Sequence, residues 1–261
     1  MIRRCVSSRA FAPRTSLSTM AQSSARAGFD GVELVVNDRG ELNLATSPAD
    51  LAALLRHFGE AGLAVAALTS DLYTTHNFAS PDESSRKTAR ETTQRLIELA
   101  CRLEAPLVWL RGAVIDPSKQ GDEIVSYEAA LNHVYEGMME VAEQAEKHGV
   151  KIAVRAASGG FLLSPVETRD LVDRLNSPAI GVAFNLNDVA RVGCPVDWLR
   201  CLSYRLHAVF LGAVDVSRET NPIDAAKICE ALNEIRYEGP MIYQSAGDLS
   251  DIAAILKTFS A

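Results

Sequence analysis

Residues 148–157 read His148-Gly149-Val150-Lys151-Ile152-Ala153-Val154-Arg155-Ala156-Ala157, an apolar run that ends on a cation. Its aliphatic and largely β-branched residues predict a strand over residues 150–154 that is buried on both faces, as in a parallel sheet. Arg155 then lies where that strand stops. Because parallel α/β proteins place their chemistry at the carboxyl ends of the strands, we expect Arg155 at the functional end of the fold.

The rest of the chain alternates strand and helix patterns around this stretch. Short apolar runs predict strands at residues 4–8, 31–36, 63–69, 106–110, 150–154, 180–184, 206–211 and 240–243. Helical patterns separate them, and the longest apolar stripe recurs at helical spacing from Tyr127 to Ala145. Eight strand-helix units joined by helical crossovers predict the α/β class and a single (β/α)8 TIM barrel, with residues 1–261 as one domain.

The composition limits the classes of function that this protein can have. With 261 residues, of which 48% are hydrophobic, the chain can bury a full barrel core. A net charge of -7 without a dense basic run disfavours a nucleic-acid partner. No window approaches the roughly 20 apolar residues that a membrane span needs. The expected partner is therefore a small molecule, and a homo-oligomer stays open.

Cysteine usage and the first residues bear on localisation. The five cysteines are odd in number and form no C-x-x-C pair, which is typical of reduced structural thiols in the cytoplasm. Residues 1–29 hold five arginines and many serines, a composition that mimics an organellar import signal. We prefer a structural interpretation, with a first strand at 4–8 and a helix over about 16–27, because removing them would leave the sheet one strand short. A cytoplasmic location follows, with organellar import as the alternative.

Common catalytic motifs are missing from the sequence. It contains no G-x-x-x-x-G-K-[ST], no G-x-G-x-x-G, no H-E-x-x-H and no G-x-S-x-G. Phosphate-loop, dinucleotide, zincin and serine-hydrolase functions therefore lack support. The strand ends remain as the place for a site.

Four segments resemble those of a known family. They are Ala27-Gly28-Phe29-Asp30-Gly31-Val32-Glu33-Leu34, His148-Gly149-Val150, Ser177-Pro178-Ala179-Ile180-Gly181-Val182 and Tyr237-Glu238-Gly239-Pro240. In this order they resemble the xylose isomerase-like TIM barrel superfamily of sugar-phosphate isomerases/epimerases, inosose dehydratases and AP endonucleases of the endonuclease IV type. The resemblance implies a divalent-metal site at the barrel mouth, built from carboxylates and histidines of strands five to eight. It also implies two glutamates that act as acid and base on a hydroxy-ketone.

The sequence departs from that pattern at almost every metal ligand. The corresponding positions hold Arg155 and Ala157 after strand five, Asn185 and Asp188 at strand six, Ala208 and Phe210 on strand seven, and Gln244 at strand eight. The two-residue strand period predicts that the neighbouring His207 points the other way. Mg²⁺ and Mn²⁺ want several anionic or strongly polar oxygens, so we expect the metal site to be degenerate, with no metal and no cofactor.

The substitutions leave a polar mouth with a fixed positive charge. Arg155 puts a cation where the metal's charge would be, while Asn185 and Gln244 keep their hydrogen-bonding capacity. One hypothesis is that Arg155, with Arg111 at the end of strand four, binds a carboxylate or phosphate. The alternative is that Arg155 pairs with Asp188 or Glu33 and fills an inactive pocket.

Four further residues each have more than one interpretation. Glu33 is either a partner of Arg155 or an acceptor for a substrate hydroxyl. His76 lies in a loop that would overhang the mouth, as a general base, a substrate contact or a solvated histidine. Trp109 and Tyr243 flank strand ends, where they stack on a sugar ring or pack in the core.

Three functions stay open. The preferred one is an isomerase-like protein of carbohydrate metabolism whose metal site is lost or altered and which binds a small polyol, sugar acid or sugar phosphate. The second is a metal-independent isomerase or epimerase in which Arg155 stabilises an enediolate and Glu33 or His76 moves the proton. The third is a structural or partner-binding barrel. Loss of the paired carboxylates disfavours the second, and the polar side chains at three strand ends disfavour the third.

Overall fold

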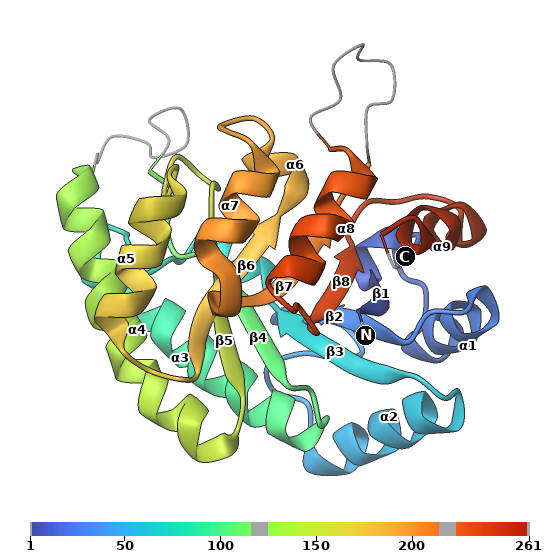
Figure 1. Ribbon diagram of the computed structural model, residues 1–261. Helices are drawn as coiled ribbons and strands as arrows, with labels where there is room; N and C mark the ends of the chain where they lie inside the picture. Colours follow the sequence, from blue (N-terminus) through green and yellow to red (C-terminus); the bar gives the residue numbers. More distant parts are fainter. Residues whose placement is uncertain (1, 116–124, 214–222, 260–261) are drawn as a thin grey trace.

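The structure, a computed structural model, describes residues 2–115, 125–213 and 223–259 (Figure 1). Its parallel strands close into a barrel in sequence order: β1 (Arg3–Ser7), β2 (Gly31–Val35), β3 (Ala64–Thr69), β4 (Leu107–Leu110), β5 (Lys151–Arg155), β6 (Ile180–Asn185), β7 (Leu206–Leu211) and β8 (Pro240–Tyr243). This arrangement confirms the predicted (β/α)8 barrel. Among the described residues, no helix is both long and apolar enough to cross a membrane.

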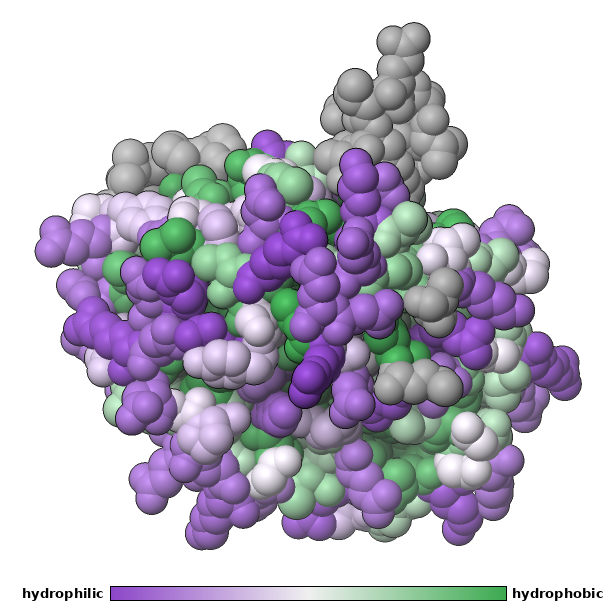
Figure 2. All heavy atoms as spheres, in the orientation of Figure 1, coloured by the Kyte–Doolittle hydropathy of each residue, from purple (hydrophilic) through white to green (hydrophobic). Residues whose placement is uncertain are grey.

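Helices surround the barrel on its outside (Figure 1). They are α1 (Leu17–Ala27), α2 (Pro48–Glu60), α3 (Glu83–Arg102), α4 (Tyr127–His148), α5 (Pro165–Leu175), α7 (Pro195–Leu202), α8 (Ala225–Glu234) and α9 (Leu249–Lys257). Short helical segments adjoin the strands: η1 (Ser8–Ala10), η2 (Asp71–Thr74), α6 (Leu186–Val189) and η4 (Ser203–Arg205). Polar side chains cover most of the outer surface in view, with apolar ones between them (Figure 2).

The arginine- and serine-rich N-terminal stretch is part of the barrel. β1 pairs with β2 on one side and with β8 on the other, so it closes the sheet. Ser16 caps α1 by accepting a hydrogen bond from the Thr19 backbone N–H, and Gly28 ends this helix with a left-handed φ of 82°. Both features follow the usual preferences at helix ends. The predicted first strand and helix are therefore confirmed.

The core has two layers. A large apolar layer fills the space between the strands and the helices. Inside the barrel, a second cluster consists mainly of small residues: Cys5, Ala66, Ala67, Leu107, Trp109, Ala153, Ala183, Ala208, Phe210 and Ile242. Trp109 and Phe210 are its large members, and their ring centroids lie 5.2 Å apart. The inward residues at the carboxyl ends of the strands lie above this filled interior and form the mouth.

An irregularity in β7 reorients His207. Val182 pairs with Leu206 but Ala183 pairs with Ala208, so His207 is an extra residue in the register. A Cβ atom added to Gly181, on the inner face of β6, would lie 2.6 Å from the His207 ring. The prediction that His207 points away from the interior is therefore wrong, because the bulge breaks the two-residue alternation.

The buried His207 is expected to make the stability of the protein depend on pH. Burial lowers the pKa of His207 from 6.5 to about 4, and the charge of Lys151 adds to this effect. Between these values the unfolded chain binds a proton that the folded chain does not, so the free energy of unfolding falls as the pH falls from 6.5 towards 4. The loss attributable to His207 is at most roughly 3 kcal/mol.

Urea unfolding at several pH values checks this. The His207→Phe variant, which keeps an aromatic ring but cannot titrate, should show a shallower pH slope in this window. His57→Gln, which removes an exposed histidine of α2, should follow the wild type. A wild-type slope in His207→Phe would contradict the expectation.

Candidate active site

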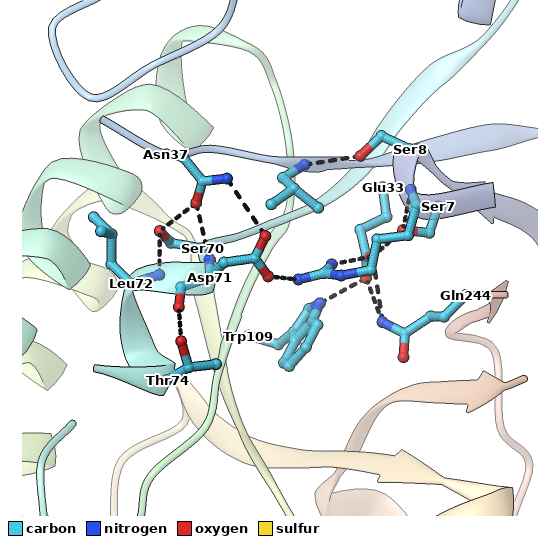
Figure 3. Close-up of polar contacts among 12 residues, drawn as sticks. Ser7, Ser8, Glu33, Asn37, Ser70, Asp71, Leu72, Thr74, Trp109 and Gln244 are labelled. Carbon is cyan, nitrogen blue, oxygen red and sulfur yellow. Dashed lines mark hydrogen bonds and ion pairs between the residues drawn. The ribbon is translucent and has the colours of Figure 1, made fainter. Parts of the chain in front are cut away.

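The mouth is organised around the buried carboxylate of Glu33. Its side chain, at the inner face of β2, is 0% exposed. Ser7 Oγ donates to Oε1 at 2.5 Å and Trp109 Nε1 donates to Oε2 at 2.6 Å. Gln244 Nε2 lies 3.3 and 3.2 Å from the two oxygens. Figure 3 shows these three side chains, which come from β1, β4 and the end of β8, converging on Glu33. Both carboxylate oxygens are therefore engaged.

Arg9 links Glu33 to a second carboxylate at the rim. Its Nη1 lies 3.4 Å from Glu33 Oε1, and its Nη2 forms a short ion pair with Asp71. Asp71 in turn is held by Asn37, whose Oδ1 accepts the Asp71 backbone N–H at 3.0 Å (Figure 3). The sequence analysis missed Ser7, Arg9, Asn37 and Asp71. The available signal was the two-residue strand period for Ser7, which shares the inward face of β1 with Cys5. It does not extend to Arg9, which lies in η1.

Arg155 is the last residue of β5 and pairs with Asp188. Its Nε and Nη2 lie 2.9 and 2.7 Å from Asp188 Oδ2, and both side chains are largely buried. Its Nη1 donates to Gln244 Oε1 at 3.5 Å, and the guanidinium lies 5.4 Å from the Trp109 ring centroid. Of the two partners considered for Arg155, the structure pairs it with Asp188, while Gln244 connects it to Glu33.

Asn185 joins the same group of side chains. Its Oδ1 accepts the Asp188 backbone N–H at 3.0 Å and so caps the short helix α6. Its Nδ2 donates to Gln244 Oε1 at 3.5 Å. The barrel therefore brings together the predicted residues Glu33, Trp109, Arg155, Asn185, Asp188 and Gln244.

Arg111 adds a second positive charge near Arg155. It follows β4 and is half-buried. Within the part of the chain that the structure describes, no acidic side chain forms an ion pair with it. Burial lowers the pKa of Arg111, and the nearby charge of Arg155 lowers it further, against the opposing effect of Asp188. A guanidinium in a protein nevertheless stays protonated. Arg111 thus adds a second guanidinium charge close to Arg155.

Two predicted site residues lie apart from this group. His76 has its Nδ1 3.3 Å from Ser85 Oγ in α3, and among the described residues it forms no hydrogen bond with Glu33 or Arg155. Tyr243 is buried in the layer between strands and helices, on the outer face of β8, because its neighbour Ile242 faces the interior. Tyr243 therefore does not line the barrel mouth.

A closed parallel barrel with polar side chains gathered at the carboxyl ends of its strands defines the class of the protein as a (β/α)8 TIM barrel, with its candidate site at the end where such barrels place theirs. Over residues 21–253 the chain matches the family described as Xylose isomerase-like TIM barrel. The chain belongs to this family. A comparison with curated proteins finds no significant match.

Several solved structures share the fold. One is L-ribulose 3-epimerase, with a TM-score of 0.81 and 18% identity, covering 100% of this chain and 95% of that one. Another is a D-tagatose 3-epimerase-like protein, with a TM-score of 0.79 and 21% identity over 99% and 97% of the two chains. A third is D-psicose 3-epimerase of Clostridium cellulolyticum H10 with D-tagatose. Its TM-score is 0.79 and its sequence identity 16%, covering 99% of this chain and 91% of that one. At such identities the likeness shows the common fold.

Proposed function

We propose that this chain binds a small anionic sugar derivative, a sugar acid or a sugar phosphate, at the barrel mouth, and that its inherited divalent-metal site is lost. Sugar epimerases among the similar structures support a sugar-like ligand. The observation that carries the anionic part is Arg111, a half-buried guanidinium without an ion-pair partner in the described chain. A carboxylate or phosphate would satisfy it with charge-assisted hydrogen bonds.

The side chains at the mouth do not fit a divalent cation. Glu33 accepts hydrogen bonds on both oxygens, and Asp188 is paired with Arg155. The remaining oxygens near them belong to the amides of Asn185 and Gln244. Asn185 Oδ1 accepts the Asp188 backbone N–H, and Gln244 Oε1 accepts from Arg155 and Asn185. In the described ranges, no group of three or more His, Cys, Asp or Glu side chains could hold a metal ion. A divalent ion would need anionic oxygens that are already committed.

The same contacts favour binding over metal-independent turnover. A proton carrier needs a carboxylate oxygen that can approach the substrate. Both oxygens of Glu33 already accept from Ser7, Trp109 and Gln244 in a fully buried position. His76, the other proton carrier considered, is directed at Ser85. We therefore propose ligand binding, and do not propose isomerisation.

Trp109 fluorescence offers a direct test of this binding. Trp198→Phe leaves Trp109 as the only tryptophan, beside Arg155 and Arg9. In this background we expect D-gluconate and D-fructose 6-phosphate to change the fluorescence saturably, and neutral D-fructose to bind more weakly. Adding Arg111→Gln should weaken the binding of both anions by about tenfold or more, because a charge-assisted hydrogen bond contributes about 1.5–3 kcal/mol.

Arg56→Gln is the matched control, because it removes the same charge from an exposed site on α2. It should leave the affinities unchanged. Equal affinities for D-gluconate and D-fructose, or unchanged anion binding in Arg111→Gln, would overturn the proposal.

A further inference from the structure

A cavity lies at the end of the barrel opposite the mouth. It has a volume of about 360 Å³ and opens among the residues that begin the strands. Its polar lining includes Arg3, Lys151, Tyr204, His207, Arg236 and Glu238. Arg3 begins β1 and Lys151 begins β5, while Arg236 and Glu238 precede β8. This cavity is therefore separated from the mouth by the filled interior of the barrel.

The cavity is positive although the protein is negative. Three cations and one carboxylate line it, a local excess of two positive charges in a chain whose net charge is -7. In the described part of the chain, none of Arg3, Lys151 and Arg236 takes part in an ion pair. Lys151 and Arg236 are exposed, and Arg3 is half-buried. Unpaired cations that converge on a concave site attract a small anion.

His207 adds a polar group that lacks a partner. The bulge in β7 turns its ring inward over Gly181, where the ring lines this cavity and a neighbouring one of about 530 Å³. Its Nδ1 is buried and has no hydrogen-bond partner. Such a group costs about 1–3 kcal/mol when it stays unsatisfied. In the orientation shown this nitrogen faces away from the cavity, and rotation of the ring would let a ligand hydroxyl donate to it or accept from it.

We infer that the amino-terminal end of the barrel is a second binding site, for a small molecule that carries both a phosphate or carboxylate and a hydroxyl group. Arg3, Lys151 and Arg236 hold the anionic group, and His207 holds the hydroxyl. Tyr204, which is 75% exposed, forms the rim that the two cavities share. The site does not depend on ligand binding at the mouth.

Calorimetric titration with glycerol 3-phosphate tests the inference. The Arg111→Gln variant is used first, because it weakens the mouth site, and we expect it to bind in the millimolar range or tighter. Adding Lys151→Gln and Arg236→Asn should weaken the binding by about tenfold or more. Asparagine suits position 236, where φ is 54°. Lys87→Gln with Arg56→Gln, two exposed helix positions, is the matched control and should change nothing.

The role of His207 is tested with a separate variant. In the same background, His207→Phe should reduce the affinity for glycerol 3-phosphate to that for inorganic phosphate, and leave the phosphate affinity unchanged. Circular dichroism confirms that each variant is folded. No binding by the Arg111→Gln variant, or an equal loss in the control pair, would overturn the second site. If D-gluconate does not change the Trp109 fluorescence but glycerol 3-phosphate still binds, the proposal for the mouth fails and the second site stands.

Discussion

Glu33→Ala is expected to lower the free energy of unfolding by roughly 3–5 kcal/mol, as the removal of one member of a buried charged cluster typically does. The fully buried carboxylate accepts from Ser7, Trp109 and Gln244 and lies beside Arg9. Without it, these donors remain in a site that water reaches poorly. At about 2–4 °C per kcal/mol, the melting temperature should fall by roughly 10 °C.

Glu33→Gln separates charge from shape. It fills the same volume but replaces one acceptor oxygen by an N–H donor that faces Ser7 or Trp109. We expect an intermediate loss of about 1–3 kcal/mol. Glu60→Ala serves as the control, because Glu60 is exposed and its pair with Arg56 spans 3.8 Å. Such a surface pair contributes at most about 1 kcal/mol. A Glu33→Ala variant as stable as Glu60→Ala would show that this cluster does not hold the mouth together.

Much of the barrel was predictable because its strands are buried on both faces. The run 240–243 is continuous and apolar, and the run 206–211 is apolar apart from His207. Their predicted bounds agree with β8 and β7. β5 is shifted by one residue, so that Arg155 ends the strand instead of following it. The shift leaves Arg155 at the mouth, and the position of this side chain was therefore predictable from the sequence.

The contacts within the mouth were harder to predict. Arg9 meets Glu33 and Asp71 because the carboxyl ends of β1, β2 and β3 lie side by side in the barrel, a contact between loops that the pattern within one strand does not show. The orientation of His207 depends on the register between β6 and β7, which cannot be predicted from the periodicity of one strand. Tyr243 is different, because the inward Gln244 already implies that its neighbour faces outward.

Arg155→Glu is expected to make the stability of the protein depend on divalent metal. The substitution removes the cation that pairs with Asp188 at 2.7 Å and places a third carboxylate near Glu33 and Asp188. Without metal, repulsion should destabilise the variant by roughly 3–5 kcal/mol, because Asp188 loses its buried partner. Mn²⁺ should then restore stability, by about 2.7 kcal/mol at a concentration 100 times the Kd.

The comparison with the wild type decides whether Arg155 stands where a metal would bind. Thermal unfolding with Mn²⁺, Mg²⁺ and Zn²⁺ should leave the wild-type melting temperature unchanged, because Arg155, Arg111 and Arg9 repel a cation at the mouth. Arg155→Gln removes the positive charge without adding an anion, so it should be destabilised but unresponsive to metal. A specific metal response of the wild type would contradict the proposed loss of the site. A response of Arg155→Glu alone means that one change of charge at the end of β5 separates a cation site from an anion site on the same barrel.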